Sequence, residues 1–180
     1  MKTLETERLI LRDWQKGDFE AAHAYASEPD NVTYMGWGPN AEDDTRNFIK
    51  QSIKKNRSNN VDYEFAVVLK ESGKLIGGCG ISKSRSRNEA MLGWILHKDY
   101  WKQGLGTELA HELLRFGFEE LKLHRIYAHC DSENYGSYRV MERNGMRKEG
   151  HFIKNCEFRG NWHDEFLYAI LEEEWKELQQ

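Results

Sequence analysis

A change of sequence period between residues 88 and 121 constrains the fold most strongly. Residues 88–97, NEAMLGWILH, have the pattern of a strand, and residues 105–121 repeat apolar side chains at helical spacing. Residues 124–131, HRIYAHCD, alternate and predict another strand. A strand, a helix and a strand in this order predict a crossover connection, which requires a sheet with helices packed on it.

The other segments add hairpins and further helices to this unit. Two strand patterns flank the turn ESGK and predict a hairpin. We expect strands at residues 7–14, 62–70, 74–82, 88–97, 124–131, 146–155 and 161–175, and helices at residues 16–27, 41–56, 105–121 and 134–145. This order predicts an α/β (α+β) fold, in which a mixed, mostly antiparallel central sheet of about seven strands carries helices on both faces. All of it fits one domain, residues 1–180.

Length and composition exclude several classes of protein. The chain has 180 residues, of which 39% are hydrophobic and 31% charged, a profile of a globular domain. No run of about 18 apolar residues is present. The stretch MKTLETERLILRDW lacks the apolar segment of a secretory signal. We therefore expect a cytoplasmic protein with no membrane partner.

Cysteines, histidines and net charge narrow the chemistry further. The three cysteines, Cys79, Cys130 and Cys156, are widely spaced without a CxxC pattern, which predicts reduced, buried thiols on strands. The seven histidines show no HExxH spacing, so we expect no metal site. The net charge of −4 disfavours a nucleic-acid partner and fits attraction of a cationic substrate.

Residues 99–109, DYWKQGLGTEL, place two glycines at the predicted start of the long helix. The Walker spacing GxxxxGK[ST] is absent, and the third glycine of a GxGxxG fingerprint would fall at Leu109. Two interpretations remain. Backbone N–H groups from Gln103 to Thr107, with Lys102 beside them, are placed to hold an anion at the helix start. Alternatively, the segment is only a turn that requires a positive φ angle at a glycine.

A longer series of motifs surrounds this turn in a fixed order. GWIL lies before it, and Asp131, Asn134, Ser137 and the sequence NGM follow it. In this order residues 88–145 resemble the GNAT superfamily of acyl-CoA N-acyltransferases. ETERLILRDW, LIGGCGI, EGHF and WHDEFLYAI are similar to its Rim-type branch, which contains ribosomal-protein N-terminal acetyltransferases. Trp101 stands where the general superfamily pattern has Gln or Arg, and the Rim-type branch often has a bulky residue there.

The resemblance implies transfer of an acetyl group from acetyl-CoA to a primary amine, first of all the N-terminal α-amine of a protein or peptide. It places the CoA pyrophosphate on the glycine turn and the pantetheine amides beside the end of the preceding strand, as an added strand would lie. Asn134 is expected to contact CoA, to cap the helix that it begins, or both. The implied CoA-binding residues are Ile95, Leu96, Trp101, Lys102, Gln103, Gly104, Leu105, Gly106, Thr107 and Asn134.

The acceptor amine must lose a proton before it attacks, because reference pKa values are about 8 for an α-amine and about 10.4 for lysine. In many members of the superfamily a tyrosine seven residues after the Asn is the general acid, but here that position is Met141. Resemblance to the Rim-type branch implies Ser137 as the acid and Glu157, in the turn CEFRG, as the base. The alternatives are that Ser137 is only a solvated helix residue and Glu157 only a solvated turn carboxylate. His163 and Asp164 offer a rival base.

The acceptor site is expected between the loop of residues 29–39, PDNVTYMGWGP, and the CEFRG turn. Tyr34 and Trp37 line it, or instead pack as a small cluster under the loop. Glu64 and Glu89 receive no role. Two other functions stay open: acetylation of a small amine (a polyamine, an amino acid or an amine antibiotic), and non-catalytic acyl-CoA binding by a sensor. The sequence fits a monomer or a homodimer.

Overall fold

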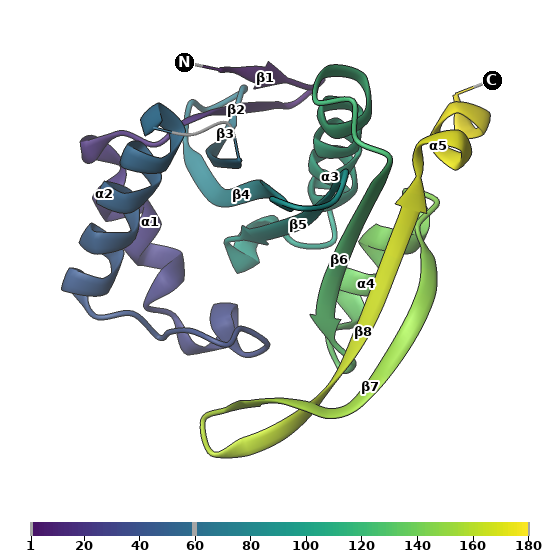
Figure 1. The fold of residues 1–180 in the computed structure, drawn as a ribbon. Helices are drawn as coiled ribbons and strands as arrows, with labels where there is room; N and C mark the ends of the chain where they lie inside the picture. Colours follow the sequence, from purple (N-terminus) through teal and green to yellow (C-terminus); the bar gives the residue numbers. More distant parts are fainter. Residues whose placement is uncertain (1, 59–60, 180) are drawn as a thin grey trace.

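The computed structural model describes residues 2–58 and 61–179, and eight strands form one sheet in the order β1-β2-β3-β4-β5-β6-β8-β7 (Figure 1). The strands are β1 (Leu4–Glu5), β2 (Leu9–Asp13), β3 (Asp62–Leu69), β4 (Leu75–Lys83), β5 (Glu89–Leu96), β6 (Arg125–Asp131), β7 (Arg147–Phe158) and β8 (Asn161–Leu171). The helices are α1 (Phe19–Ala26), α2 (Glu42–Ser58), α3 (Leu105–Arg115), α4 (Tyr135–Arg143) and α5 (Glu172–Leu178). Short helical turns lie at η1 (Lys16–Asp18), η2 (Pro29–Val32), η3 (Lys98–Tyr100) and η4 (Phe116–Glu120).

The strand directions confirm a mixed, mostly antiparallel sheet. Neighbouring strands are antiparallel except β5 and β6, which are the parallel pair joined by α3. This pair is short, running only from Glu89 opposite Arg125 to Met91 opposite Tyr127. On its other edge β6 pairs with β8 along its whole length. Beyond Met91, β5 and β6 therefore separate (Figure 1).

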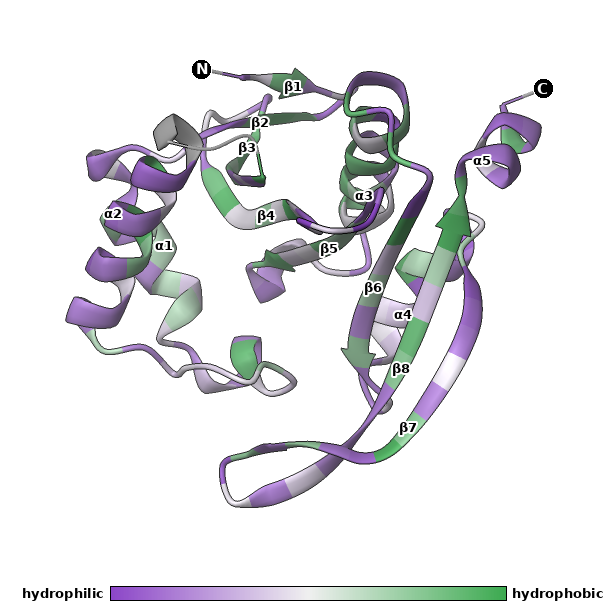
Figure 2. Cartoon of the chain, viewed as in Figure 1, coloured by the Kyte–Doolittle hydropathy of each residue, from purple (hydrophilic) through white to green (hydrophobic). Residues whose placement is uncertain are grey.

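Helices cover both faces of the sheet, as expected. Leu109 of α3 lies in the main core, together with Phe65 and Val67 of β3. Ala66 belongs instead to a second cluster, which packs α1 and α2 against the sheet. Since successive strand residues point to opposite faces, the two clusters lie on opposite sides of the sheet. Figure 2 shows the corresponding pattern, with α2 mainly hydrophilic and the sheet rich in hydrophobic residues.

The chain ends differ from the prediction. The expected last strand stops at Leu171, and the acidic run after it forms α5 instead. The side chain of Glu174 accepts a hydrogen bond from the Leu171 N–H, which caps the helix start. Trp175 is buried against His111 and Phe118. Because this helix is only seven residues long, its helical period is too short to recognise. The two-residue β1 is the strand missing from the predicted seven.

The last hairpin also differs from the prediction. We expected a turn at residues 156–160, but β7 continues to Phe158, which pairs with Asn161 of β8. Only Arg159 and Gly160 form the turn, and both have positive φ angles, 50° and 74°. Glu157 is thus a strand residue opposite Trp162, not a turn residue.

The structure confirms the expected burial for two of the three cysteines. Cys79 and Cys130 are buried on β4 and β6, whereas Cys156 on β7 is half-buried, and all three are free thiols. Within residues 2–58 and 61–179, no helix has both the length and the apolar content needed to span a bilayer.

Candidate active site

Two neighbouring cavities lie where β5 and β6 separate. The turn cavity, about 550 Å³, is lined by the end of β5, residues 100–102 and 104–107, and one side of α4 as far as Arg143. The sheet cavity, about 920 Å³, is lined by β3, β4, β5, α2 and the loop after η2. Six residues line both cavities, so the two spaces meet there: Tyr34, Met35, Trp94, Ile95, Asn134 and Ser137.

The turn before α3 presents backbone N–H groups to the turn cavity. Gly104 is the N-cap of α3, has a left-handed φ of 80° and provides no side chain to cap the helix. The first N–H groups of an α-helix have no partner within the helix, and the helix dipole adds positive potential there. Lys102, Arg139 and Arg143 also line the turn cavity. These groups suit a pyrophosphate, so the chain fits the expected CoA.

The two glycines of the turn have different roles. Gly104 supplies the left-handed conformation, which L side chains rarely adopt. A Cβ at Gly106 would lie 3.3 Å from Val140 Cγ2, so this glycine permits close packing of α3 against α4. The two interpretations of this segment are therefore compatible: Gly104 has the positive φ of the turn interpretation, and the helix start beside it has the N–H groups of the cradle interpretation. Leu105 and Thr107 line the turn cavity with the two glycines.

Two predicted CoA residues of the turn are oriented by contacts within the protein. Gln103 is not among the lining residues: its side chain donates to the Asp99 carbonyl at 2.9 Å, and its own carbonyl accepts from Arg8 at 3.0 Å. Trp101 lines the cavity and donates its indole N–H to the Leu96 carbonyl at 2.8 Å. The indole of Trp101 thus satisfies the last backbone carbonyl of β5.

At the end of β5, the backbone groups of Ile95 and Leu96 are not placed as expected for contacts with pantetheine. A Cβ at Gly77 would lie 2.1 Å from the Ile95 carbonyl oxygen, so this carbonyl faces β4 rather than the gap. The Leu96 carbonyl already accepts from Asn31 and Trp101. Because backbone groups alternate between the two edges of a strand, the backbone of Trp94 faces the gap toward β6.

A row of three directly opposed residues forms one part of the sheet cavity. Glu64 of β3 is opposite Gly80 of β4, which is opposite Gly93 of β5. A Cβ at Gly80 would lie 2.9 Å from Glu64 Oε2, so the carboxylate lies over this glycine. A Cβ at Gly93 would have no atom within 4 Å. The sheet is therefore free of side chains beside the Glu64 carboxylate.

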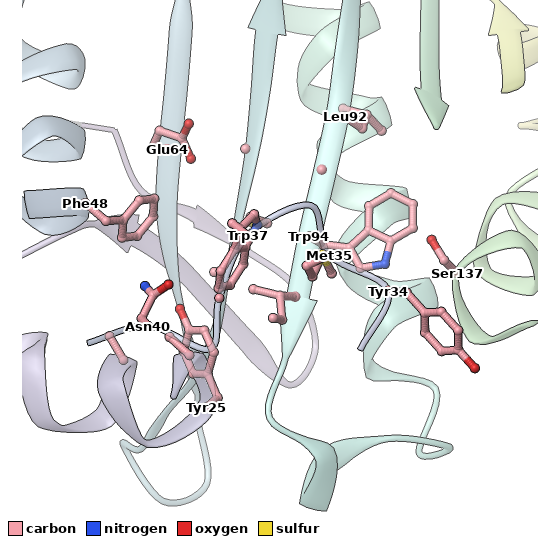
Figure 3. A pocket seen from close by; sticks show the side chains of 18 of the residues that line it. Tyr25, Tyr34, Met35, Trp37, Asn40, Phe48, Glu64, Leu92, Trp94 and Ser137 are labelled. Carbon is pink, nitrogen blue, oxygen red and sulfur yellow. The ribbon is translucent and has the colours of Figure 1, made fainter. Parts of the chain in front are cut away.

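Electrostatics of the sheet cavity favour a cation. Burial raises the pKa of the Glu64 carboxyl, and Lys55, whose Nζ is 3.7 Å from Glu64 Oε1, opposes this. Asp44 of α2 adds a second lining carboxylate. Among the described residues that line this cavity, none is a lysine or an arginine. In Figure 3, Glu64 and Ser137 lie on opposite sides of the cavity, with Trp37 and Trp94 between them in this view.

The junction of the cavities contains the expected acid. Asn134 accepts from the Ser137 N–H at 3.1 Å, which confirms that it caps α4. It also lines both cavities, where its expected contact with CoA stays a prediction. Ser137 also lines both cavities and interacts with the Cys130 thiol. Burial raises the pKa of Cys130 to about 12, so this thiol stays protonated at neutral pH. Met141 is buried at the base of the same region.

Glu157 and the rival base lie away from this junction. Glu157 is exposed on the β7–β8 hairpin and lines neither cavity, so the structure does not bring it together with Ser137. His163 Nδ1 lies 2.8 Å from Asp131 Oδ2, and its ring stacks on Phe158 at 3.7 Å. These contacts give His163 a structural environment outside the cavities.

Tyr34 and Trp37, the expected acceptor residues, both line the sheet cavity. Sequence reasoning missed Glu64. The available signal was a carboxylate inside an apolar strand, DYEFAVVL, followed across a hairpin by the glycine-rich strand LIGGCG. In the described part of the chain, no cluster of three His, Cys, Asp or Glu side chains is arranged to hold a metal ion.

Comparisons with known proteins agree with this arrangement. A family model described as an acetyltransferase (GNAT) domain matches residues 8–147. The uncharacterized N-acetyltransferase YnaD of Bacillus subtilis (strain 168) is 39% identical over 173 residues, which is 96% of this chain and 98% of that protein. A GNAT-family acetyltransferase structure from Bacillus anthracis is 38% identical, with a TM-score of 0.87 over 96% of this chain and 99% of that one.

A more distant structure has the same fold with ligands bound. The spermidine N-acetyltransferase of Vibrio cholerae, solved in complex with CoA and spermine, has a TM-score of 0.80 at 22% identity. The match covers 93% of this chain and 98% of that one. At this identity the likeness shows the fold alone.

Proposed function

The chain belongs to the GNAT acetyltransferases and is an acetyl-CoA-dependent N-acetyltransferase, and from this premise we propose that its acceptor is a small primary amine that binds as a cation. One observation carries the proposal. The half-buried Glu64 carboxylate faces a side-chain-free area of sheet at Gly80 and Gly93. An ammonium group fits such a place, because a desolvated carboxylate attracts it more strongly than a solvated one does.

The turn cavity holds the CoA moiety in this proposal. Acetyl-CoA supplies the acetyl thioester. The N–H groups after Gly104, with Lys102, bind its pyrophosphate. The backbone of Trp94 pairs with the pantetheine arm along the exposed edge of β5. This path leads to the junction at Asn134 and Ser137, where the reacting carbon meets the sheet cavity.

Glu64 is the proposed general base. Gly93 is two strands away from Glu64, which is about 10 Å between backbones, and the carboxylate reaches over the intervening Gly80. An amine above Gly93 is then within one water molecule of the carboxylate. Glu64 holds the incoming ammonium, accepts its proton and leaves a neutral amine. The raised pKa makes this carboxylate a stronger base than an exposed one.

Ser137 is the proposed hydrogen-bond donor to the departing thiolate of CoA. Its hydroxyl lies at the start of α4, where the helix dipole favours negative charge. The departing thiolate carries such a charge. Ser137 therefore stabilises the sulfur with a hydrogen bond, and Met141 supplies no proton at the position of the superfamily tyrosine.

A peptide N-terminus is the second candidate acceptor. It rests on the Rim-type motifs EGHF and WHDEFLYAI in the sequence. An α-amine needs less help to lose its proton than an alkyl amine does, because its reference pKa is about 8. The Glu64 carboxylate favours the small cation instead, and the Rim-type assignment stays a prediction.

A panel of amines with release of free CoA as the readout tests the proposal. The panel contains diamines and polyamines, single amino acids, amine antibiotics, and peptides of several lengths with a free N-terminus. We expect the highest kcat/KM for small amines with more than one positive charge. Turnover confined to peptides would replace the proposal with the second candidate.

A binding measurement without turnover tests the remaining alternative, a non-catalytic acyl-CoA sensor. Calorimetry with acetyl-CoA, in the absence of amine, reports on the turn cavity alone. Tight acetyl-CoA binding without CoA release from any amine would support the sensor function and contradict both enzymatic candidates.

A further inference from the structure

The turn of the β7–β8 hairpin contacts the loop that lines the sheet cavity. Arg159 Nη1 donates to the Thr33 carbonyl at 2.8 Å. Arg159 Nη2 is shared among the carbonyls of Val32 at 2.9 Å, Gly38 at 3.1 Å and Trp37 at 3.2 Å. One guanidinium therefore binds both ends of residues 32–38, although the hairpin and the loop are more than 120 residues apart in sequence.

The backbone conformation of the hairpin turn does not favour an arginine at position 159. Arg159 and Gly160 both have positive φ, and Phe158 pairs with Asn161, which defines a two-residue type I′ turn. Asn-Gly is the favoured sequence for that turn, and arginine is strained in a left-handed conformation. A residue that departs from the favoured turn sequence directs attention to its contacts outside the turn. Here these are the four carbonyl contacts.

The segment between the two pinned ends carries the cavity lining. Tyr34 and Met35 line both cavities, and Trp37 lines the sheet cavity. A guanidinium presents five N–H donors in a fixed plane, so it can fix several carbonyls at once, which an ammonium cannot do with the same geometry.

We propose that Arg159 is a positioning residue for the acceptor: it fixes residues 32–38 so that Tyr34 and Trp37 form the wall of the sheet cavity. This inference rests on the proposed function of that cavity as the acceptor site. Arg159 acts through the loop and contacts no reacting atom. Without it the loop loses its anchor, and the acceptor loses a preformed wall. The four guanidinium hydrogen bonds all go to this loop, and none of them goes to the glycine turn that is proposed to hold the CoA pyrophosphate.

The variant Arg159→Asn separates this role from a role in the turn. Asn-Gly preserves or improves a type I′ turn, so we expect a Tm no lower than that of the parent protein. We expect the KM of the best amine to rise about tenfold or more, while the Kd for acetyl-CoA changes less than twofold. Arg159→Lys should restore only part of the loss.

Lys154→Asn is the matched control. Lys154 is an exposed cation on the same hairpin, with a φ of 48°, so the control removes the same charge from a similar backbone. Its amine KM should equal that of the parent protein. An unchanged KM in Arg159→Asn, or an equal rise in Lys154→Asn, would overturn the proposal.

Hydrogen exchange of residues 32–38 tests the anchor without any acceptor. We expect faster amide exchange there in Arg159→Asn and no change in Lys154→Asn. Unchanged exchange in Arg159→Asn would overturn the inference. If the parent protein turns over no amine, the proposed function fails, and the exchange result still decides whether Arg159 fixes the loop.

Discussion

The two cavities of this molecule are built from different parts of the chain. In the turn cavity, the proposed CoA contacts are mainly backbone groups, namely the N–H groups after Gly104 and the edge of β5 at Trp94. The sheet cavity depends on individual side chains, above all Glu64, placed over glycines by strand register. The N–H groups of the turn come from a few consecutive residues, whereas the row at Glu64 combines strands that are joined only by their register.

This difference sets how each site responds to substitution. A backbone donor survives most side-chain replacements, so single variants around the turn cavity should have small effects. Among the described residues that line the sheet cavity, the only carboxylate besides Glu64 is Asp44, which lies on another element. Variants there should therefore have larger effects, mostly on the acceptor and on turnover.

Glu64→Gln should give the largest effect. Without the base, we expect kcat to fall about 100-fold or more, with little change in the Kd for acetyl-CoA. Because burial raises the pKa of this carboxyl above its ordinary value of 4.5, parent activity should decline as pH falls through that raised pKa. The variant should lose this acidic limb in a pH–rate profile. Glu89→Gln, another half-buried carboxylate on the sheet, should keep it.

Gly93→Val should give the next largest effect. A Cβ at Gly93 meets no atom within 4 Å, so the fold accepts the side chain, which then occupies acceptor space. We expect kcat/KM for the amine to fall about 10- to 100-fold, with acetyl-CoA binding retained. A valine that left amine kinetics unchanged would place the acceptor elsewhere. Gly17→Ala, at an equally open glycine outside both cavities, controls for loss of glycine flexibility.

Ser137→Ala should have a moderate effect. The Ser137 N–H still bonds to Asn134, so α4 stays capped while the hydroxyl is lost. We expect kcat to fall about tenfold, with less loss for an acyl donor whose thiol leaves more easily. An equal loss for both donors would show that Ser137 does not assist departure of the sulfur.

Lys102→Asn should have the smallest effect. Asparagine tolerates the left-handed φ of 60° at this position, so the variant removes only the charge. We expect the Kd for acetyl-CoA to rise about threefold at low salt and less at high salt, since Lys102 is exposed. A loss of 100-fold would mean that side chains, not backbone, dominate the turn cavity.

The same division explains what could be predicted from the sequence. The strand, glycine turn and long helix of residues 88–121 are contiguous, so their period and their glycines predicted these elements directly and motivated the anion site proposed at the turn. Glu64 gave only the weaker signal of a carboxylate inside an apolar strand, because the role proposed for it depends on the register that sets it opposite Gly80 and on a cavity between separate elements.

Two other differences have local causes. Glu157 was expected in a five-residue turn, but the pairing of Phe158 with Asn161 leaves only Arg159 and Gly160 to turn the chain. The start of helix α5 was expected to continue the last strand, because its seven residues contain four glutamates and one buried tryptophan, which leaves too few apolar positions for a helical pattern.

The short pairing of β5 with β6 has a consequence for the stability of the whole molecule. Three residue pairs join the sheet halves β1–β5 and β6–β8, and α3 is the covalent crossover between them. A pantetheine arm paired with the edge at Trp94 would span this seam as one more strand. We therefore expect acetyl-CoA to slow amide exchange on both sides of this seam, in β5 and in β6, and to raise the Tm of the protein.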